Sequence, residues 1–167
     1  MILVTVGTDL PFDRMMRVVD DWVCQNGRQD VFAQIGKGGW EPPHIRFAHF
    51  LAPPEFTQYF ESAHVIIAHA GMGTILAALH YGKPILVMPK MASLGEHRNE
   101  HQTATARRMM ALVGVNVAFD AAELRSCLDR LDELAMPRRI GLAASADLLS
   151  GLHEFIHQSS TQRNDSQ

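Results

Sequence analysis

The stretch HVIIAHAGMGTILAALHYGKPILVMPK, residues 64–90, decides the fold. An apolar run over 64–70 is followed by a turn with two glycines, a helical pattern over 73–80 and a second apolar run over 85–89. Strands that are apolar on both faces are typical of parallel sheets, whose neighbouring strands need a helical crossover. The stretch therefore predicts a βαβ unit, with the glycine-rich turn at the carboxyl edge of a sheet.

The same alternation of strands and helices continues on both sides of this unit. Further strands are predicted at 2–6, 31–36, 45–50 and 115–119, and helices at 12–25, 53–61, 99–112, 121–134 and 138–157. This order predicts an α/β fold, a doubly wound parallel sheet of the Rossmann-like kind. A chain of 167 residues corresponds to one domain, which we place at 1–158, followed by a polar, disordered tail at 159–167.

Composition excludes several classes of protein. The formal net charge of -3 argues against a broad basic face for nucleic acid. No apolar run reaches the roughly 18 residues of a membrane span, no signal peptide is visible, and the two cysteines have no CxxC spacing. We expect a cytoplasmic protein without a nucleic-acid partner.

The turn at 69–74 has two interpretations. Glycines at 71 and 73 relieve crowding in any tight βα connection, but they also let a ligand approach the backbone closely. Free amides at a helix start attract phosphates, and Thr74 adds a hydroxyl. The P-loop motif GxxxxGK[ST] and the dinucleotide fingerprint GxGxxG after the first strand are both absent.

Three polar loops follow strands, at 7–9, 69–74 and 89–102, so a parallel sheet gathers them at one edge. This convergence favours the phosphate interpretation. The third loop has His97 and His101 four residues apart, with acidic neighbours, but the order HExxH is absent. A loop that contacts sugar hydroxyls explains the same polar density, and no metal site is predicted.

Several ordered motifs resemble a known family: ILVTVGT, FAQIGKG, FLAPPEFTQYFESAHVIIAHAG, the stretch at 69–90, and GEHRNEHQ. Together they cover about residues 1–120 and resemble the C-terminal, donor-binding half of GT-B glycosyltransferases of family 28. Within that family, the sequence is most similar to stand-alone bacterial subunits of exopolysaccharide assembly. It is also similar to the small catalytic subunit of the dolichol-linked N-acetylglucosaminyltransferase.

The resemblance implies a role for each matching residue. It assigns Gly7 and Thr8 to the cleft facing the sugar donor, Phe50 and Leu51 to the segment that contacts uracil, His69, Ala70, Gly71, Met72, Gly73 and Thr74 to the diphosphate, and Glu100, His101 and Gln102 to the sugar hydroxyls. One position departs from the family. Many relatives carry an acidic residue for the ribose where this chain has Ala77.

The resemblance also implies a reaction, which is inverting transfer of a hexosyl group from a UDP-sugar without a metal or other cofactor. The general base and the acceptor surface usually belong to the other GT-B half, so no catalytic residue is assigned here. The expected partner is a membrane-associated acceptor-binding subunit, which would hold the chain at the inner face of the membrane beside a lipid-linked acceptor. Without that partner, the chain is expected to be inactive and able to form a homodimer.

A second function class stays open. A nucleotide-sugar sensor or regulatory module would keep this fold without turnover, and both Ala77 and the missing acceptor half are compatible with it.

Overall fold

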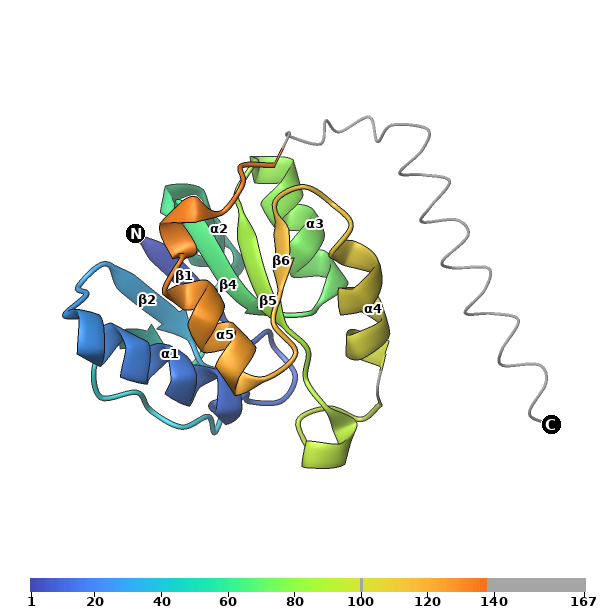
Figure 1. Ribbon diagram of the computed structural model, residues 1–167. Coiled ribbons are helices and arrows are strands. Elements are labelled where there is room, and N and C mark those ends of the chain that lie inside the picture. Colours follow the sequence, from blue (N-terminus) through green and yellow to red (C-terminus); the bar gives the residue numbers. More distant parts are fainter. Residues whose placement is uncertain (100, 138–167) are drawn as a thin grey trace.

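The computed structural model describes residues 1–99 and 101–137, which form a parallel sheet flanked by helices (Figure 1). The strands are β1 (Ile2–Thr5), β2 (Val31–Gln34), β3 (Arg46–Ala48), β4 (Val65–His69), β5 (Ile85–Met88) and β6 (Val115–Val117). The α-helices are α1 (Asp13–Asn26), α2 (Pro53–Ser62), α3 (Met72–Tyr81), α4 (His101–Met109) and α5 (Ala121–Leu128), and two short 3₁₀ helices are η1 (Ala92–Leu94) and η2 (Leu131–Glu133).

The sheet has the order β3-β2-β1-β4-β5-β6, and every neighbouring pair is parallel. Ile2 is in register with Val31 on one side and with Val65 on the other. The chain therefore leaves β1 toward one edge, then returns to build the other half. This doubly wound α/β fold confirms the prediction from the apolar runs.

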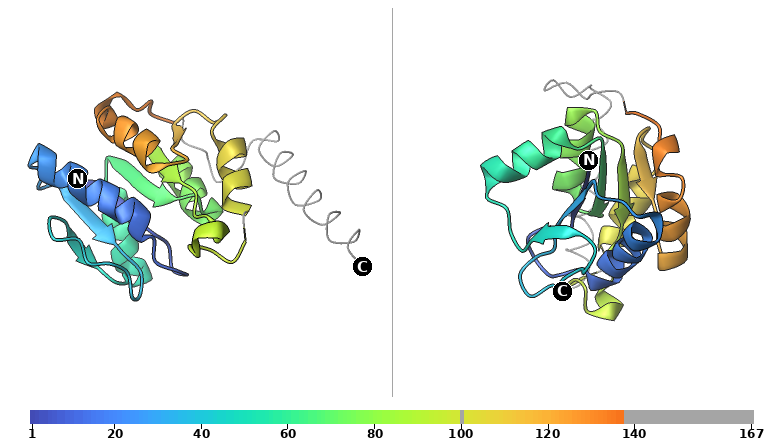
Figure 2. Two further views of the ribbon diagram at one scale, coloured as in Figure 1. Left: turned by 60° about the horizontal axis from the view of Figure 1, so that its bottom comes forward. Right: turned by 90° about the vertical axis from the view of Figure 1, so that its left-hand side faces the viewer.

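The core has one layer on each face of the sheet. Ile2 and Val4 of β1 pack with apolar residues of α1 and α5, whereas Leu3 packs with apolar residues of α2, α3 and α4. Alternate strand residues point to opposite faces, and both faces are covered, so the strands are buried throughout. The right-hand view of Figure 2 shows the sheet edge-on, with α1 and α5 on one side and α2 and α3 on the other.

The order of strands reverses between β1 and β4. In open α/β sheets, the crevice outside the carboxyl ends of two such strands is the usual ligand site. The loops after β1 and β4 border this crevice, and η1 lies beyond the same edge, at the bottom of Figure 1.

Some predicted elements are shorter in the structure. The helix predicted at 121–134 ends at Leu128, and Arg130 leaves the helical conformation with φ -117 and ψ 26. The break turns Leu131 into the core, where it is 2% exposed. The helix predicted at 138–157 and the tail predicted at 159–167 lie outside the described residues, as does the domain boundary at 158.

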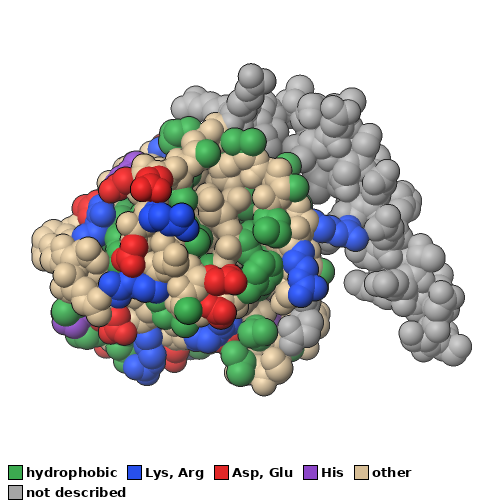
Figure 3. Space-filling model, viewed as in Figure 1, with side chains coloured by type: hydrophobic (Ala, Val, Ile, Leu, Met, Phe, Trp, Pro, Cys, Tyr) green, Lys and Arg blue, Asp and Glu red, His purple; other side chains and the backbone are tan. Residues whose placement is uncertain are grey.

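The described surface mixes charges of both signs. In the view of Figure 3, acidic and basic side chains alternate over the α1 and α5 side of the molecule. Among the helices within 1–99 and 101–137, none has the length and apolar character needed to cross a bilayer.

Candidate functional site

A pocket of about 450 Å³ opens at the carboxyl edge of the sheet, beside the point where the strand order reverses. We call it the carboxyl-edge pocket. It is lined by Thr5, Gly7, Thr8, Gln34, Phe50, Leu51, Pro53, Phe56, Thr57, His69, Gly71, Gly73 and Thr74. Three of these residues, Thr5, Gln34 and His69, are the last residues of β1, β2 and β4. The sheet itself thus supplies the floor, and the loops after β1, β3 and β4 supply the walls together with residues of α2 and α3.

The pocket brings together most of the residues proposed from the sequence. Gly7, Thr8, Phe50, Leu51, His69, Gly71, Gly73 and Thr74 line it, whereas Ala70, Met72, His101 and Gln102 do not. Ala70 is buried in the core layer that contains α3. Gln102 is 3% exposed, and its Oε1 accepts a hydrogen bond from the backbone amide of Lys90 at 3.1 Å. Glu100 lies outside the described residues.

The His69 imidazole lies between two glycines. A Cβ added to Gly7 would lie 2.6 Å from Cε1 of this ring, and a Cβ added to Gly71 would overlap its Nε2. Gly7 also has φ +82, a conformation that glycine adopts at no steric cost. These two glycines therefore make room for His69, a requirement that sequence reasoning did not detect.

Burial keeps His69 neutral. It lowers the pKa of this imidazole to about 4, with further lowering by the Lys90 and His97 charges and an opposing contribution from the Thr5 backbone. Its Nδ1 is buried and has no hydrogen-bond partner in the described part of the chain. At neutral pH, the floor of the pocket thus carries an uncharged imidazole.

Gly73 is different from the other two glycines. It lies in the first turn of α3, and no atom lies within 4 Å of a Cβ added there. The N-cap of α3 is Gly71, which offers no side-chain acceptor to the first amides. Since Ile75 is the first residue to donate to the Gly71 carbonyl, at 3.1 Å, the amides before it precede the helical ladder. This open, uncapped helix start is suited to an anion.

The opposite wall of the pocket is apolar. Phe50 is 62% exposed, an unusual state for a phenylalanine, and Pro53 and Phe56 of the α2 start lie beside it. Sequence reasoning missed Thr5 and Gln34, as well as Pro53, Phe56 and Thr57. Strand ends were the available signal for the first two, and the i, i+3, i+4 spacing of one helix face was the signal for the other three.

The described residues of the third predicted loop, at 89–102, do not line the pocket but pack beside it. Lys90, directly after β5, is 1% exposed, and its Nζ donates to the Leu10 carbonyl in the β1–α1 loop. Burial lowers the pKa of this ammonium to about 8, although the Asp9 and Glu96 carboxylates oppose the shift. The loop after β5 therefore packs on the loop after β1, beside the pocket.

The rings of His97 and His101 approach edge to face, with centroids 4.7 Å apart. Within 1–99 and 101–137, no group of three or more His, Cys, Asp or Glu side chains is arranged to hold a metal ion.

Comparison with known proteins decides the family. The model of the glycosyltransferase family 28 C-terminal domain matches residues 1–140. The chain belongs to this family. It is accordingly a glycosyltransferase domain, and its sheet corresponds to one half of a GT-B fold.

Solved structures agree with this fold at low sequence identity. The glycotransferase of kitacinnamycin has a TM-score of 0.59 at 21% identity, over 78% of this chain and 34% of that one. The solution structure of ALG13 has a TM-score of 0.56 at 17% identity, over 83% and 88%. MurG of Acinetobacter baumannii has a TM-score of 0.56 at 16% identity, over 80% and 42%.

The share of each neighbour that this chain covers differs between the three structures. The chain spans about a third of the kitacinnamycin glycotransferase and less than half of MurG, but most of ALG13. No curated protein sequence matches this one.

Proposed function

We propose that this chain is the donor-binding catalytic subunit of a heteromeric inverting glycosyltransferase. It transfers a sugar from a UDP-sugar to a lipid-linked acceptor in exopolysaccharide synthesis. The observation that carries the proposal is the carboxyl-edge pocket, which has an uncapped helix start on one side and an exposed aromatic ring on the other. A nucleotide sugar has the matching parts, an anionic diphosphate and a planar base.

The diphosphate is assigned to the start of α3. Gly73 leaves space for phosphate oxygens to reach the first-turn amides, and the positive end of the helix dipole stabilises them. During an inverting displacement, negative charge grows on the departing UDP, so donors already oriented toward it lower the barrier. In this proposal, the helix amides perform this task and no metal ion is required.

The base is assigned to the aromatic wall. Its ring would lie against Phe50 and Pro53, because stacking removes apolar surface of both partners from water. The sugar would then extend toward the β5–α4 side, where Glu100 and His101 are its proposed contacts. Gln102 is buried, so we assign it the support of Lys90 instead of direct contact.

The acceptor and the general base are assigned to a partner. The chain spans less than half of MurG and most of ALG13, and we propose that a second subunit supplies the remainder. We propose that this subunit is membrane-associated and holds the chain at the inner face of the membrane. In its absence, we expect the chain to form a homodimer.

A non-catalytic nucleotide-sugar sensor is the second candidate, and Ala77 favours it. This residue lies one turn of α3 after Gly73, which lines the pocket, and Ala77 itself packs against the core layer that contains α3. An alanine side chain cannot accept hydrogen bonds from ribose hydroxyls. We therefore expect the site to bind its nucleotide more weakly than a site with a carboxylate at this position.

Calorimetric titration of the purified chain tests the proposal, with UDP, UDP-glucose and UDP-N-acetylglucosamine as ligands and GDP as the control. We expect uridine nucleotides to bind and GDP to bind at least about tenfold more weakly, a difference of 1.4 kcal/mol. The titration is then repeated with the acceptor-binding partner co-expressed, together with an assay of sugar transfer.

Each result has one meaning. Selective uridine binding followed by transfer with the partner supports the catalytic subunit. Selective binding without transfer in the complex favours the sensor. A complex that binds none of these nucleotides overturns both candidates.

A further inference from the structure

The chain after β5 is held in place by side chains instead of regular structure. We call residues 89–99 the β5–α4 segment; within it, only Ala92–Leu94 form a short 3₁₀ helix. The segment hangs below the sheet in Figure 1, next to the β1–α1 loop. Its conformation therefore depends on a few contacts that can be identified one by one.

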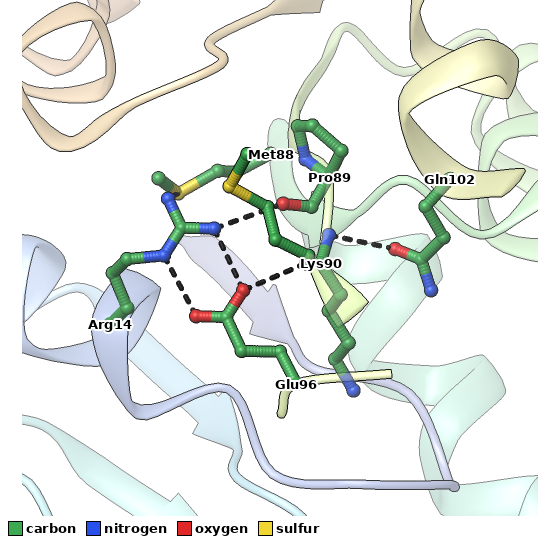
Figure 4. Close-up of polar contacts among 7 residues, drawn as sticks. Arg14, Met88, Pro89, Lys90, Glu96 and Gln102 are labelled. Carbon is green, nitrogen blue, oxygen red and sulfur yellow. Dashed lines mark hydrogen bonds and ion pairs between the residues drawn. The ribbon is translucent and has the colours of Figure 1, made fainter. Parts of the chain in front are cut away.

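The central contact is an ion pair between α1 and this segment (Figure 4). Arg14 Nε donates to Glu96 Oε1 at 2.7 Å, and Arg14 Nη2 donates to Glu96 Oε2 at 2.8 Å. The two side chains are only 22% and 12% exposed. This forked geometry is the strong form of an Arg–carboxylate pair, and low exposure limits its screening by salt.

The same two side chains also fix the backbone around them. Arg14 Nη2 donates to the Pro89 carbonyl at 3.1 Å, at the first residue after β5. Glu96 Oε2 accepts from the Met91 amide at 2.9 Å, and the Glu96 amide donates to the Met91 carbonyl at 3.1 Å. The pair thus closes the loop over 91–96 and attaches it to α1.

His97 follows directly and lies beside the β1–α1 loop, which borders the pocket, although His97 itself does not line it. Its Nε2 lies 4.0 Å from Asp9 Oδ2 in the β1–α1 loop, and its side chain is 14% exposed. Its charge also lowers the pKa of His69, on the floor of the carboxyl-edge pocket. Because His97 is the next residue in the chain after Glu96, moving Glu96 would move His97 relative to the β1–α1 loop.

We infer that Arg14 and Glu96 are positioning residues, whose ion pair sets His97 beside the pocket as a contact for the transferred sugar of the donor. The inference rests on the proposed function for the identity of the ligand. Neither side chain lines the pocket, so both act through the segment that they hold.

The first test needs no nucleotide. Hydrogen exchange is measured on the wild type, Arg14→Met and Glu96→Gln. We expect the Met91 and Glu96 amides to exchange at least about tenfold faster in both variants, with Ile75 unchanged. The control is Arg28→Met, which removes a similar forked pair to Asp30, at 2.9 and 3.0 Å, before β2 at the other end of the strands. Unchanged exchange of the segment in both variants overturns the inference.

The second test separates positioning from general support of the fold. We measure the ratio of the UDP dissociation constant to that of the tighter of UDP-glucose and UDP-N-acetylglucosamine. In Arg14→Met and Glu96→Gln, this ratio should fall about five- to tenfold toward one, with UDP affinity unchanged. Arg28→Met should leave both unchanged. A partial return of the ratio in the charge-swapped double variant Arg14→Glu, Glu96→Arg would support the pairing directly.

The two failures are distinguishable. If the wild type binds no uridine nucleotide even with its partner, the proposed function fails. Hydrogen exchange then remains the test of whether the ion pair holds the β5–α4 segment. The positioning role fails if the wild type binds UDP as tightly as the UDP-sugars, or if the ratio of dissociation constants is unchanged in both variants. In either case the nucleotide site is still supported.

Discussion

Gly73 and Gly71 are two residues apart, yet the structure predicts opposite consequences for the same added methyl group. At Gly73, no atom lies within 4 Å of a new Cβ, so Gly73→Ala should fold normally. Alanine should even stabilise the protein, by up to about 1 kcal/mol, because it restricts the unfolded chain and favours the helix. At Gly71, the new Cβ would overlap the partly buried His69 ring, which must move at a cost of roughly 1–3 kcal/mol.

For nucleotide binding we expect the opposite order, in which the substitution at Gly73 is the more damaging of the two. The methyl of Gly73→Ala would occupy the space through which phosphate oxygens reach the α3 amides. Losing one hydrogen bond to a charged group costs roughly 1.5–3 kcal/mol, which weakens UDP binding by about ten- to a hundredfold. The bulkier Gly73→Val should abolish binding without unfolding the protein.

Thermal denaturation and calorimetry measure the two effects separately. In a domain of this size, 1 kcal/mol corresponds to roughly 2–4 °C in Tm, so the two alanine variants should differ by at least about 2 °C. Wild-type UDP affinity in Gly73→Ala would refute the assignment of the diphosphate to α3. A loss of Tm in Gly73→Ala equal to that in Gly71→Ala would show that the space at Gly73 is not open.

Three further predictions concern other parts of the site. His69 has a pKa of about 4 in the folded protein against 6.5 in the unfolded chain, so the unfolded chain binds the proton first as pH falls. The free energy of unfolding should therefore decrease between pH 6.5 and about 4, by about 3 kcal/mol in total, and urea titrations of His69→Asn should lack most of this slope. Phe50→Ala should keep the wild-type Tm but weaken UDP binding about three- to tenfold, because about 0.5–1.5 kcal/mol of stacking is lost. Inorganic pyrophosphate, which has no base, should bind as before. Equal losses of affinity for both ligands would argue against a base at this wall. Ala77→Glu should raise the preference for UDP over 2′-deoxy-UDP at least about tenfold in competition titrations, because the new carboxylate can accept a hydrogen bond from the ribose 2′-hydroxyl. An unchanged preference would place the ribose away from this face of α3.

Local patterns predicted most of the fold. The apolar runs at β1, β4 and β5 have no polar alternation, and the intervening segments have helical spacing, so a parallel sheet was the expected arrangement. The end of α5 was not predictable in this way. Arg130 has no feature that stops a helix, and the break occurs because Leu131 is buried against the sheet.

The candidate site was predictable where it depends on chain order. Gly7, Thr8 and the turn around Gly73 come directly after strands, and the carboxyl ends of parallel strands share one edge. Phe56 and Thr57 were missed because their helix faces the pocket only after the sheet is assembled. Gln102 was expected beside the sugar, but the structure turns it toward Lys90.

The sequence by itself determined the order of the strands and helices, the edge of the sheet that carries the site, and the family. These properties follow from spacing along the chain, which a single sequence records. Only the tertiary structure decided which glycine accommodates His69 and which one opens the pocket, and that Arg14 pairs with Glu96, 82 residues away. Such contacts depend on where distant segments meet, and no local pattern of residues encodes that distance.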